Sequence, residues 1–311
     1  LPTSASGPVE YVTREKGISH DVHGHWKYQG NPGQYELYSD VDNLFHSEFG
    51  VDGASGTKSL RKFLSEAECR PVSMEKSLVW RHHGEWWDTW ERDTELFGAL
   101  NDIEQFSDAS QWIQAEGLRF VLEANRRRQF RNSGSIIWQV NEPFPNASCT
   151  NLIDYYGESK MAYYWTRKAF SPFHVSAEYR KLDWAVGEML EAQLYINGIS
   201  EAEGLTVVSS VINRQGEVVY EQKNTGNIDG DHACLIGRLQ VPVTPSFGEL
   251  FLLRLALLDA KGSFLFANDY FFSTQRKFVY RDALHFTKAE LVTTAVNEWQ
   301  ATEAAGGLHA E

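Results

Sequence analysis

The fold of this chain is decided by the stretch Asn43-Leu44-Phe45-His46-Ser47-Glu48-Phe49-Gly50-Val51-Asp52-Gly53. A short apolar run stops at the carboxylate of Glu48, and a turn punctuated by Gly50 and Gly53 follows it. Apolar runs of this length, bounded by glycine, are typical of buried strands. The pattern therefore predicts a strand that points an acid out of its end.

A second segment repeats this design, in the residues Gly134-Ser135-Ile136-Ile137-Trp138-Gln139-Val140-Asn141-Glu142-Pro143. An apolar strand again ends in an aromatic ring and several polar groups. In a β/α barrel, the active site occupies the carboxyl ends of the strands. Two strands that deliver polar side chains at these ends favour that fold class.

Length and charge limit the classes of protein that fit. At 311 residues the chain can bury a large core and form two domains. Lys and Arg total 29 against 42 Asp and Glu, which gives a formal net charge of −13. Such an acidic surface argues against nucleic acid and anionic membrane as partners. No stretch is apolar enough to span a bilayer, and a sequence that starts at Leu1 gives no information on export.

The chain has only three cysteines, and their spacing does not predict a metal site. Cys69, Cys149 and Cys234 match neither a zinc knuckle nor a disulfide framework. We expect three free thiols, which favours a reducing compartment such as the cytoplasm but leaves the localisation open. No cofactor is expected.

The first half of the chain predicts loops and one long helix. Residues 1–41 are rich in Gly, Pro, Tyr and His without periodicity, which predicts a long functional loop. Residues 60–106 predict irregular short helices and loops. Asp108 and Gln111 are spaced as a capping box. The helix that they would open places four residues on one side: Leu118, Val121, Leu122 and Asn125. The arginines at 126–128 suit the end of that helix and are expected to be solvated.

The pattern changes after Pro172 to alternating apolar and polar residues. A strand over 205–212 leads through a turn at 213–216 into a second strand at 217–220, and a similar hairpin joins 251–255 to 264–266. Short strands with turn signals and no long helix predict an immunoglobulin-like β-sandwich over residues 173–275. Residues 276–311 fit neither domain and are expected to be a tail or the start of a further module.

Three segments of the chain resemble segments of glycoside hydrolase family 2, which includes β-mannosidase and β-galactosidase. "FHSEFG" at 45–50 resembles the nucleophile segment of that family. "GSIIWQVNEPFP" at 134–145 and "IDYYGESKMAYYWTRKAFSP" at 153–172 resemble the last barrel strand and helix of its β-mannosidase-like members.

Further segments occur in the order that this resemblance requires. "SQWIQAEGLRFVLEANRRR" at 110–128 is similar to the intervening helix. "PTSASGP" at 2–8 and "HDVHGHWKY" at 20–28 are similar to the loop after the sixth strand. The resemblance implies that residues 1–172 are the C-terminal portion of a (β/α)8 TIM barrel, with about its last two strand–helix units. An immunoglobulin-like β-sandwich would follow, in a multidomain α/β plus β protein.

The resemblance also implies roles for individual residues. Glu48 would be the nucleophile of a retaining glycosidase, which attacks the anomeric carbon. Trp138 could stack on the apolar face of a sugar, while Asn141 and Glu142 are candidate ligands of its hydroxyl groups. Core filling is the alternative for Trp138.

A dense group of histidines and one aspartate precedes Glu48, in the segment His20, Asp21, His23 and His25. These residue types can bind metal, but a cluster in a loop is weak evidence and no metal is expected. The resemblance favours contact with substrate by Asp21, His23 or Trp26. His83, beside Trp86 and Trp87, could line the mouth of the site or belong to a packing cluster between helices.

The chain shows too few strand–helix units for a complete barrel, which needs eight. By the resemblance, the strand with the general acid/base is missing, so we expect an incomplete fragment that is inactive alone. The missing N-terminal part of the same enzyme is a possible partner. The function expected is retaining hydrolysis of terminal β-linked sugars such as a β-mannoside or β-galactoside, through a covalent intermediate on Glu48. The alternatives are a β-galactosidase, β-glucuronidase or exo-glucosaminidase of the family, or a non-catalytic carbohydrate-binding or assembly fragment.

Overall fold

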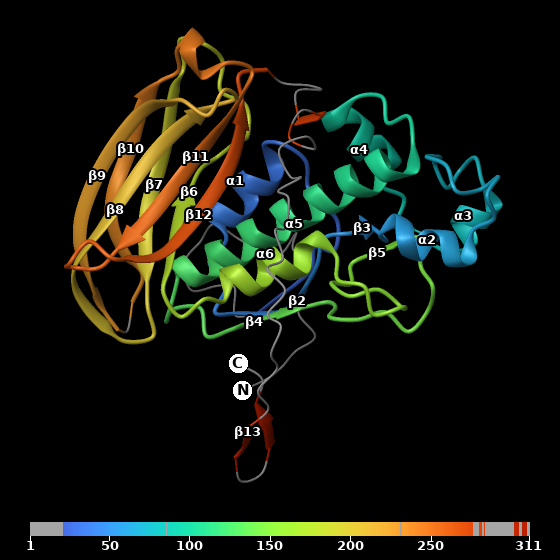
Figure 1. The fold of residues 1–311 in the computed structure, drawn as a ribbon, viewed down its shortest axis with the longest axis horizontal. Helices are drawn as coiled ribbons and strands as arrows, with labels where there is room; N and C mark the ends of the chain where they lie inside the picture. The colour runs from blue at the N-terminus through green and yellow to red at the C-terminus, as the bar shows by residue number, and fades with distance from the viewer. Residues whose placement is uncertain are drawn as a thin grey trace.

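The computed structural model describes residues 21–84, 86–230 and 232–275, the residues Tyr280, Arg281 and Ala283, and strands at 302–304 and 307–309. A part with mixed helices and strands packs beside a sandwich of antiparallel sheets (Figure 1). The long helix α5 (Ile103–Arg127) runs through the middle of the mixed part.

Three parallel strands form the sheet of the mixed part. They are β1 (Asp21–His23), β2 (Phe45–Phe49) and β4 (Ser135–Ile137), in the order β1-β2-β4. Helix α1 (Gly33–Asp40) connects β1 to β2, and α5 lies in the connection from β2 to β4. Parallel neighbours require such crossover connections, and helices supply them here.

The loop predicted over 1–41 is wrong for its described residues. Strand β1 and helix α1 lie there, and Val22, Tyr35 and Tyr38 are fully buried. The ring of Tyr35 lies 4.8 Å from that of Phe120 and 5.2 Å from that of Tyr179. Contacts with rings more than eighty positions away, rather than local periodicity, order this segment, and the prediction from local pattern missed it.

Short elements complete the mixed part, as expected for 60–106. They are β3 (Gly53–Ala54), which pairs with β5 (Ser148–Cys149), and the helices α2 (Thr57–Phe63), α3 (Leu78–His82), α4 (Trp90–Phe97) and α6 (Met161–Ala169). Helix α6 packs along α5. No helix among the described residues is long and apolar enough to cross a membrane.

Helix α5 starts six residues earlier than the sequence predicts, with its N-cap at Asp102 instead of Asp108. Its N-cap is Asp102, whose carboxylate accepts a hydrogen bond from the backbone N–H of Gln105 at 2.8 Å. Asp102 and Gln105 have the same spacing as Asp108 and Gln111, so the sequence offers two capping boxes. The earlier one is used because Ile103 and Phe106, which lie between Asp102 and Asp108, are buried in the core.

The sandwich confirms the predicted hairpins. One sheet has the order β10-β7-β6 and the other β12-β11-β8-β9. The strands are β6 (His174–Glu178), β7 (Met189–Asn197), β8 (Glu201–Asn213), β9 (Val218–Asp229), β10 (Cys234–Pro242), β11 (Leu250–Leu258) and β12 (Phe264–Ser273). A short 3-10 turn, η2 (Pro245–Phe247), precedes β11. Outside the sandwich, β13 (Thr302–Ala304) pairs with β14 (Gly307–His309).

The arginines at the end of α5 join the two parts of the molecule instead of extending into solvent. Arg126 donates to the carbonyl of Ala169 at 2.7 Å, and Arg127 donates to the carbonyl of Ala177 in β6 at 3.3 Å. The prediction of a solvated helix end is therefore wrong. The backbone carbonyls that accept from these cations lie at the end of α6 and in β6, and the sequence of α5 does not reveal them.

A buried polar cluster fixes the sandwich against α5. The carboxylate of Glu123 accepts hydrogen bonds from Asn268 at 2.6 Å and from the hydroxyl of Tyr270 at 2.9 Å, and His174 lies 3.0 Å away. All four side chains are buried. Such a cluster is specific to one orientation of the two parts, because each polar group must find its partner.

Candidate functional site

Glu48 lies on a β-bulge of the central strand. In β2, His46 and Phe49 are three residues apart. Their pairing partners in β4, Ser135 and Ile137, are only two residues apart. On the other side, Val22 pairs with His46 and the next residue of β1, His23, pairs with Glu48. Strand β2 thus holds one extra residue relative to both neighbours.

This extra residue determines which way Glu48 faces. Side chains alternate between the faces of a regular strand, so His46 and Glu48 would share a face. Instead, His46 stacks on Phe49 with ring centroids 4.2 Å apart, both rings are buried, and His46 faces helix α5, where Nδ2 of Asn125 lies 3.1 Å away. Glu48 is left partly exposed on the opposite side, with its side chain 24% accessible. Bulges that redirect one side chain are common beside active sites.

Two side chains from the end of β1 contact the Glu48 carboxylate. The indole N–H of Trp26 donates to Oε1 at 2.9 Å, and Nε2 of His23 lies 3.6 Å from Oε2. The rings of His23 and Trp26 meet edge to face at 5.3 Å. The structure thus brings three of the expected site residues together.

Asp21 supports this group from the start of β1. Its Oδ1 accepts from the backbone N–H of Ser47 at 3.1 Å, and the Ser47 hydroxyl lies 3.2 Å from Nδ1 of His23. Ser47 is a site residue that sequence reasoning missed, although it lies inside the quoted motif. Its hydroxyl is small and local patterns do not mark it.

Trp138 lies where β4 continues past its last paired residue. Its backbone N–H donates to the carbonyl of Phe49 at 2.7 Å, and its side chain is 44% exposed. The peptide bond between Trp138 and Gln139 is cis. A Cβ atom on Gly50 would come within 2.4 Å of the Trp138 carbonyl oxygen, so only glycine permits this approach of the two strand ends.

Asn141 and Glu142 follow in the loop after β4 and differ in exposure. Asn141 is exposed and forms an isolated bridge with Ile153. Glu142 is buried, and its Oε2 accepts from the side-chain amide of Gln139 at 3.1 Å. Burial, together with a hydrogen bond to Glu142, raises the pKa of the Cys149 thiol to about 11. Glu142 therefore contacts Gln139 of the same loop and Cys149 of β5.

His83 packs against the same loop from the end of α3. Its Nδ1 lies 2.8 Å from the carbonyl oxygen of Pro145, and its ring stacks on Phe144 at 5.5 Å. The ring of Phe63 lies 4.6 Å away on α2. His83 thus borders the loop that follows Trp138, while its contacts are those of a packed aromatic cluster.

No three His, Cys, Asp or Glu side chains lie close enough to hold a metal ion in the described part of the chain. His20, one of the four residues of the histidine-rich group, lies outside the described residues. The three cysteines are unpaired.

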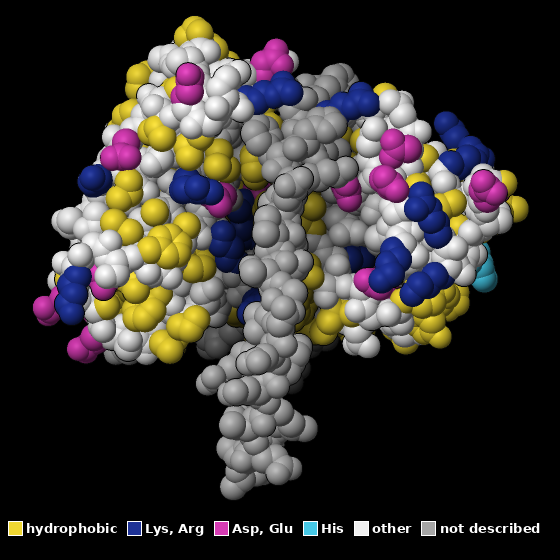
Figure 2. All heavy atoms as spheres, in the orientation of Figure 1, with side chains coloured by type: hydrophobic (Ala, Val, Ile, Leu, Met, Phe, Trp, Pro, Cys, Tyr) yellow, Lys and Arg dark blue, Asp and Glu magenta, His cyan; other side chains and the backbone are white. Residues whose placement is uncertain are grey.

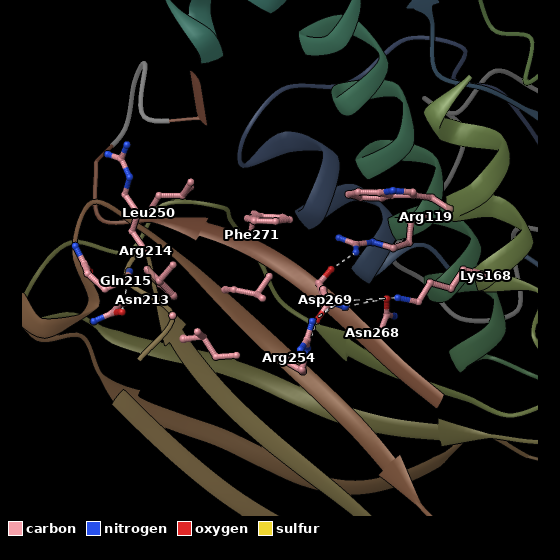
Figure 3. Close-up of a pocket in the computed structure, with 15 residues that line it drawn as sticks. Arg119, Lys168, Asn213, Arg214, Gln215, Leu250, Arg254, Asn268, Asp269 and Phe271 are labelled. Carbon is pink, nitrogen blue, oxygen red and sulfur yellow. Dashed lines mark hydrogen bonds and ion pairs between the residues drawn. The ribbon is translucent and has the colours of Figure 1, made fainter. Parts of the chain in front are cut away.

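A cavity of about 640 Å³ lies away from Glu48, between helices α5 and α6 and the sandwich (Figure 3). Lys168 and Arg254 converge there on the carboxylate of Asp269, and Arg119 contacts the Asp269 carbonyl. None of the expected site residues is among its described lining residues. On the face of the molecule that Figure 2 shows, acidic and basic side chains of the described residues are interspersed, without a large patch of one sign.

Among known proteins, the chain is similar to β-mannosidases and an exo-β-D-glucosaminidase. No protein-family profile matches the chain. It is 26% identical over 187 residues to an exo-β-D-glucosaminidase of Amycolatopsis orientalis, an overlap of 58% of this chain and 17% of the relative. It is 23% identical over 243 residues to a β-mannosidase B of Emericella nidulans, covering 68% of this chain and 28% of the relative.

Solved structures show the same fold over most of the chain. A β-D-mannosidase from Dictyoglomus thermophilum matches with a TM-score of 0.64 and 23% identity, covering 86% of this chain and 31% of that one. The exo-chitosanase of Amycolatopsis orientalis matches with a TM-score of 0.61 and 21% identity, over 81% of this chain and 30% of that one.

The resemblance to the C-terminal part of a β-mannosidase-like enzyme of glycoside hydrolase family 2 is thus confirmed. The chain spans less than a third of the length of each of these relatives.

Proposed function

We propose that this chain carries the nucleophile-bearing end of the catalytic domain of a retaining β-glycosidase, with a β-mannosidase-like preference. The observation that carries this proposal is the carboxylate of Glu48, which a bulge directs to the open side of a parallel sheet. The exposed ring of Trp138 at the end of the next strand supports the proposal, because an aromatic ring can stack on the apolar face of a sugar.

In this mechanism, Glu48 attacks the anomeric carbon and forms a covalent glycosyl-enzyme, which water then hydrolyses. The Trp26 N–H holds Oε1 at 2.9 Å and limits rotation of the carboxylate, so that Oε2 is left for attack. A second carboxyl group, about 5–5.5 Å from the nucleophile, protonates the leaving oxygen. The resemblance implies that the strand with this acid/base is missing from the chain, so we assign the acid/base to residues outside these 311.

The three parallel strands would be the last three of a (β/α)8 barrel, within a domain over residues 1–172. In the described sheet β1 and β4 are edge strands, and Ile136, Trp138 and Val140 along β4 and its extension are exposed. Unpaired strand edges with apolar side chains favour pairing with further strands. The missing N-terminal part of the same enzyme is the partner that would supply them.

Labelling of the full-length parent enzyme with a mechanism-based 2-fluoro-mannoside tests the assignment. We expect the sugar on the peptide that contains Glu48, and no labelling in Glu48→Gln. Glu142→Gln is the matched control, because it changes the other carboxylate of the two motifs and should still be labelled. Labelling of a different carboxylate in the unmodified enzyme would contradict the proposal.

A non-catalytic carbohydrate-binding fragment is the second candidate. It is favoured by the described parallel sheet, which has three strands where a complete barrel has eight. The other sugar specificities of the family also stay open, since an exo-β-D-glucosaminidase is among the relatives. Comparing aryl β-mannoside, β-galactoside, β-glucuronide and β-glucosaminide as substrates of the full-length enzyme separates these alternatives.

A further inference from the structure

The loop that brings Trp26 to Glu48 is held at one peptide group. The backbone N–H of Gly24 donates to the carbonyl of Glu48 at 2.6 Å, and the carbonyl of Gly24 lies 2.8 Å from Nε2 of His46. Gly24 is therefore tied to β2 on both sides of the bulge. Trp26 follows two residues later, so the position of Gly24 determines where its indole can reach.

The contacts of His46 specify its protonation. A carbonyl oxygen only accepts, so Nε2 of His46 must carry the proton that it shares with Gly24. Nδ1 lies 3.1 Å from Nδ2 of Asn125, an amide nitrogen that only donates. His46 is therefore the neutral tautomer with an accepting Nδ1, and burial lowers its pKa to about 4, which is consistent with this state.

The orientation of the Asn125 amide is fixed from the helix. Arg128 donates to its Oδ1 at 2.8 Å, so the two hydrogens of Nδ2 must point the other way. One reaches His46 on β2, and the other reaches the hydroxyl of Ser135 on β4 at 2.7 Å. Hydrogen bonds link Arg128 to Asn125, Asn125 to His46 and His46 to the carbonyl of Gly24. The donor and the acceptor of each of these bonds are thus determined.

We propose that His46 and Asn125 are positioning residues, which set the loop of Trp26 against Glu48 and hold β2 in register with β4. Both residues are buried, and both act through the groups that they hold. The catalytic meaning of this role rests on the proposed function of Glu48, but the geometric role does not.

The isolated 311-residue chain can be tested by its indole N–H resonances in nitrogen-15 spectra. Trp26→Phe identifies the Trp26 signal by its loss, and Glu48→Gln gives the displacement that follows when the charged acceptor is removed. We expect His46→Phe to displace the Trp26 signal in the same direction. Phenylalanine keeps the stack on Phe49 but cannot bind Gly24 or Asn125.

Two variants separate positioning from general loss of packing. His46→Gln offers a donor and an acceptor, and we expect it to restore the Trp26 signal. His174→Phe is the matched control. It also removes a hydrogen bond of a buried histidine, the 3.0 Å bond between His174 and Glu123, but this bond lies at the sandwich. It should leave the Trp26 signal unchanged.

An unchanged Trp26 signal in folded His46→Phe would overturn the proposal. If that variant does not fold, Asn125→Leu serves in its place, and the same absence of a shift would count against us. Fluorosugar labelling of a carboxylate other than Glu48 would remove the proposed function while leaving the indole result intact, so the two failures are distinguishable.

Discussion

Glu48 and Trp138 come from neighbouring strands, and their backbones are locked together at the strand ends by Gly50. The Trp138 ring is exposed while its backbone is bonded to Phe49, so truncating the ring should leave the sheet intact.

Trp138→Ala is expected to reduce kcat/KM of the full-length enzyme by about tenfold or more, since a loss of about 1.4 kcal/mol in transition-state binding corresponds to that factor. Circular dichroism should stay unchanged. Tyr164→Ala removes another exposed aromatic ring, on α6, and serves as the control. Unchanged kinetics in Trp138→Ala would assign Trp138 to packing instead.

His46 should make the free energy of unfolding depend on pH. Its pKa is lowered from 6.5 to about 4 by burial, so between these values the unfolded chain binds more protons than the folded one. Stability is then lost as pH falls through this window, by at most roughly 3 kcal/mol. The pKa of His174 is also lowered, and it contributes in the same direction.

The measurement is urea unfolding from pH 7 down to the acid limit of folding, for the unmodified chain and His46→Phe. We expect a flatter pH dependence in the variant. Equal slopes would show that His46 does not titrate as its burial predicts.

At the scale of elements, α5 illustrates how a local signal can occur twice. Both Asp102 and Asp108 begin a capping box, and the structure uses Asp102. The choice depends on burial of the residues between them, which the capping pattern alone does not encode.

Asp102→Ala is therefore expected to destabilise the chain by about 1 kcal/mol, the usual contribution of an N-cap. Asp102→Asn keeps a side-chain oxygen that can accept from Gln105 and should cost less. Thermal unfolding of the two variants checks the order. An equal loss in Asp102→Asn would show that Asp102 does not stabilise the helix as its N-cap.

At the scale of the whole molecule, α5 connects the site to the sandwich. Asn125 holds β2 and β4, while Glu123, on the same helix, binds His174, Asn268 and Tyr270 of the sandwich. The polar contacts of Glu123 that hold the sandwich thus lie within one helical turn of Asn125, to which we assign a positioning role.

The isolated chain is expected to have no hydrolase activity. Retaining hydrolysis requires two carboxyl groups, and proton donation to the leaving oxygen is by itself worth roughly 10²–10⁴-fold. An assay on aryl β-mannoside and β-galactoside, with intact mass to exclude a longer chain, tests this. Turnover abolished by Glu48→Gln would show that a second catalytic carboxyl lies within these residues.

The sequence by itself determined the features that depend on neighbouring residues. The strand that ends near Glu48, the strand before Trp138 and both hairpins of the sandwich follow from local patterns of apolar, polar and glycine residues. The resemblance of the chain rested on the same short segments.

The tertiary structure alone decided the features that depend on distant partners. The face of Glu48 depends on pairing of β2 with two other strands, and the burial of Tyr35 depends on rings of α5 and the sandwich. The tautomer of His46 depends on Gly24 and Asn125, which lie on either side of it in sequence. A local pattern cannot carry this information, because hydrogen-bond direction and burial are properties of groups that meet only in the folded chain.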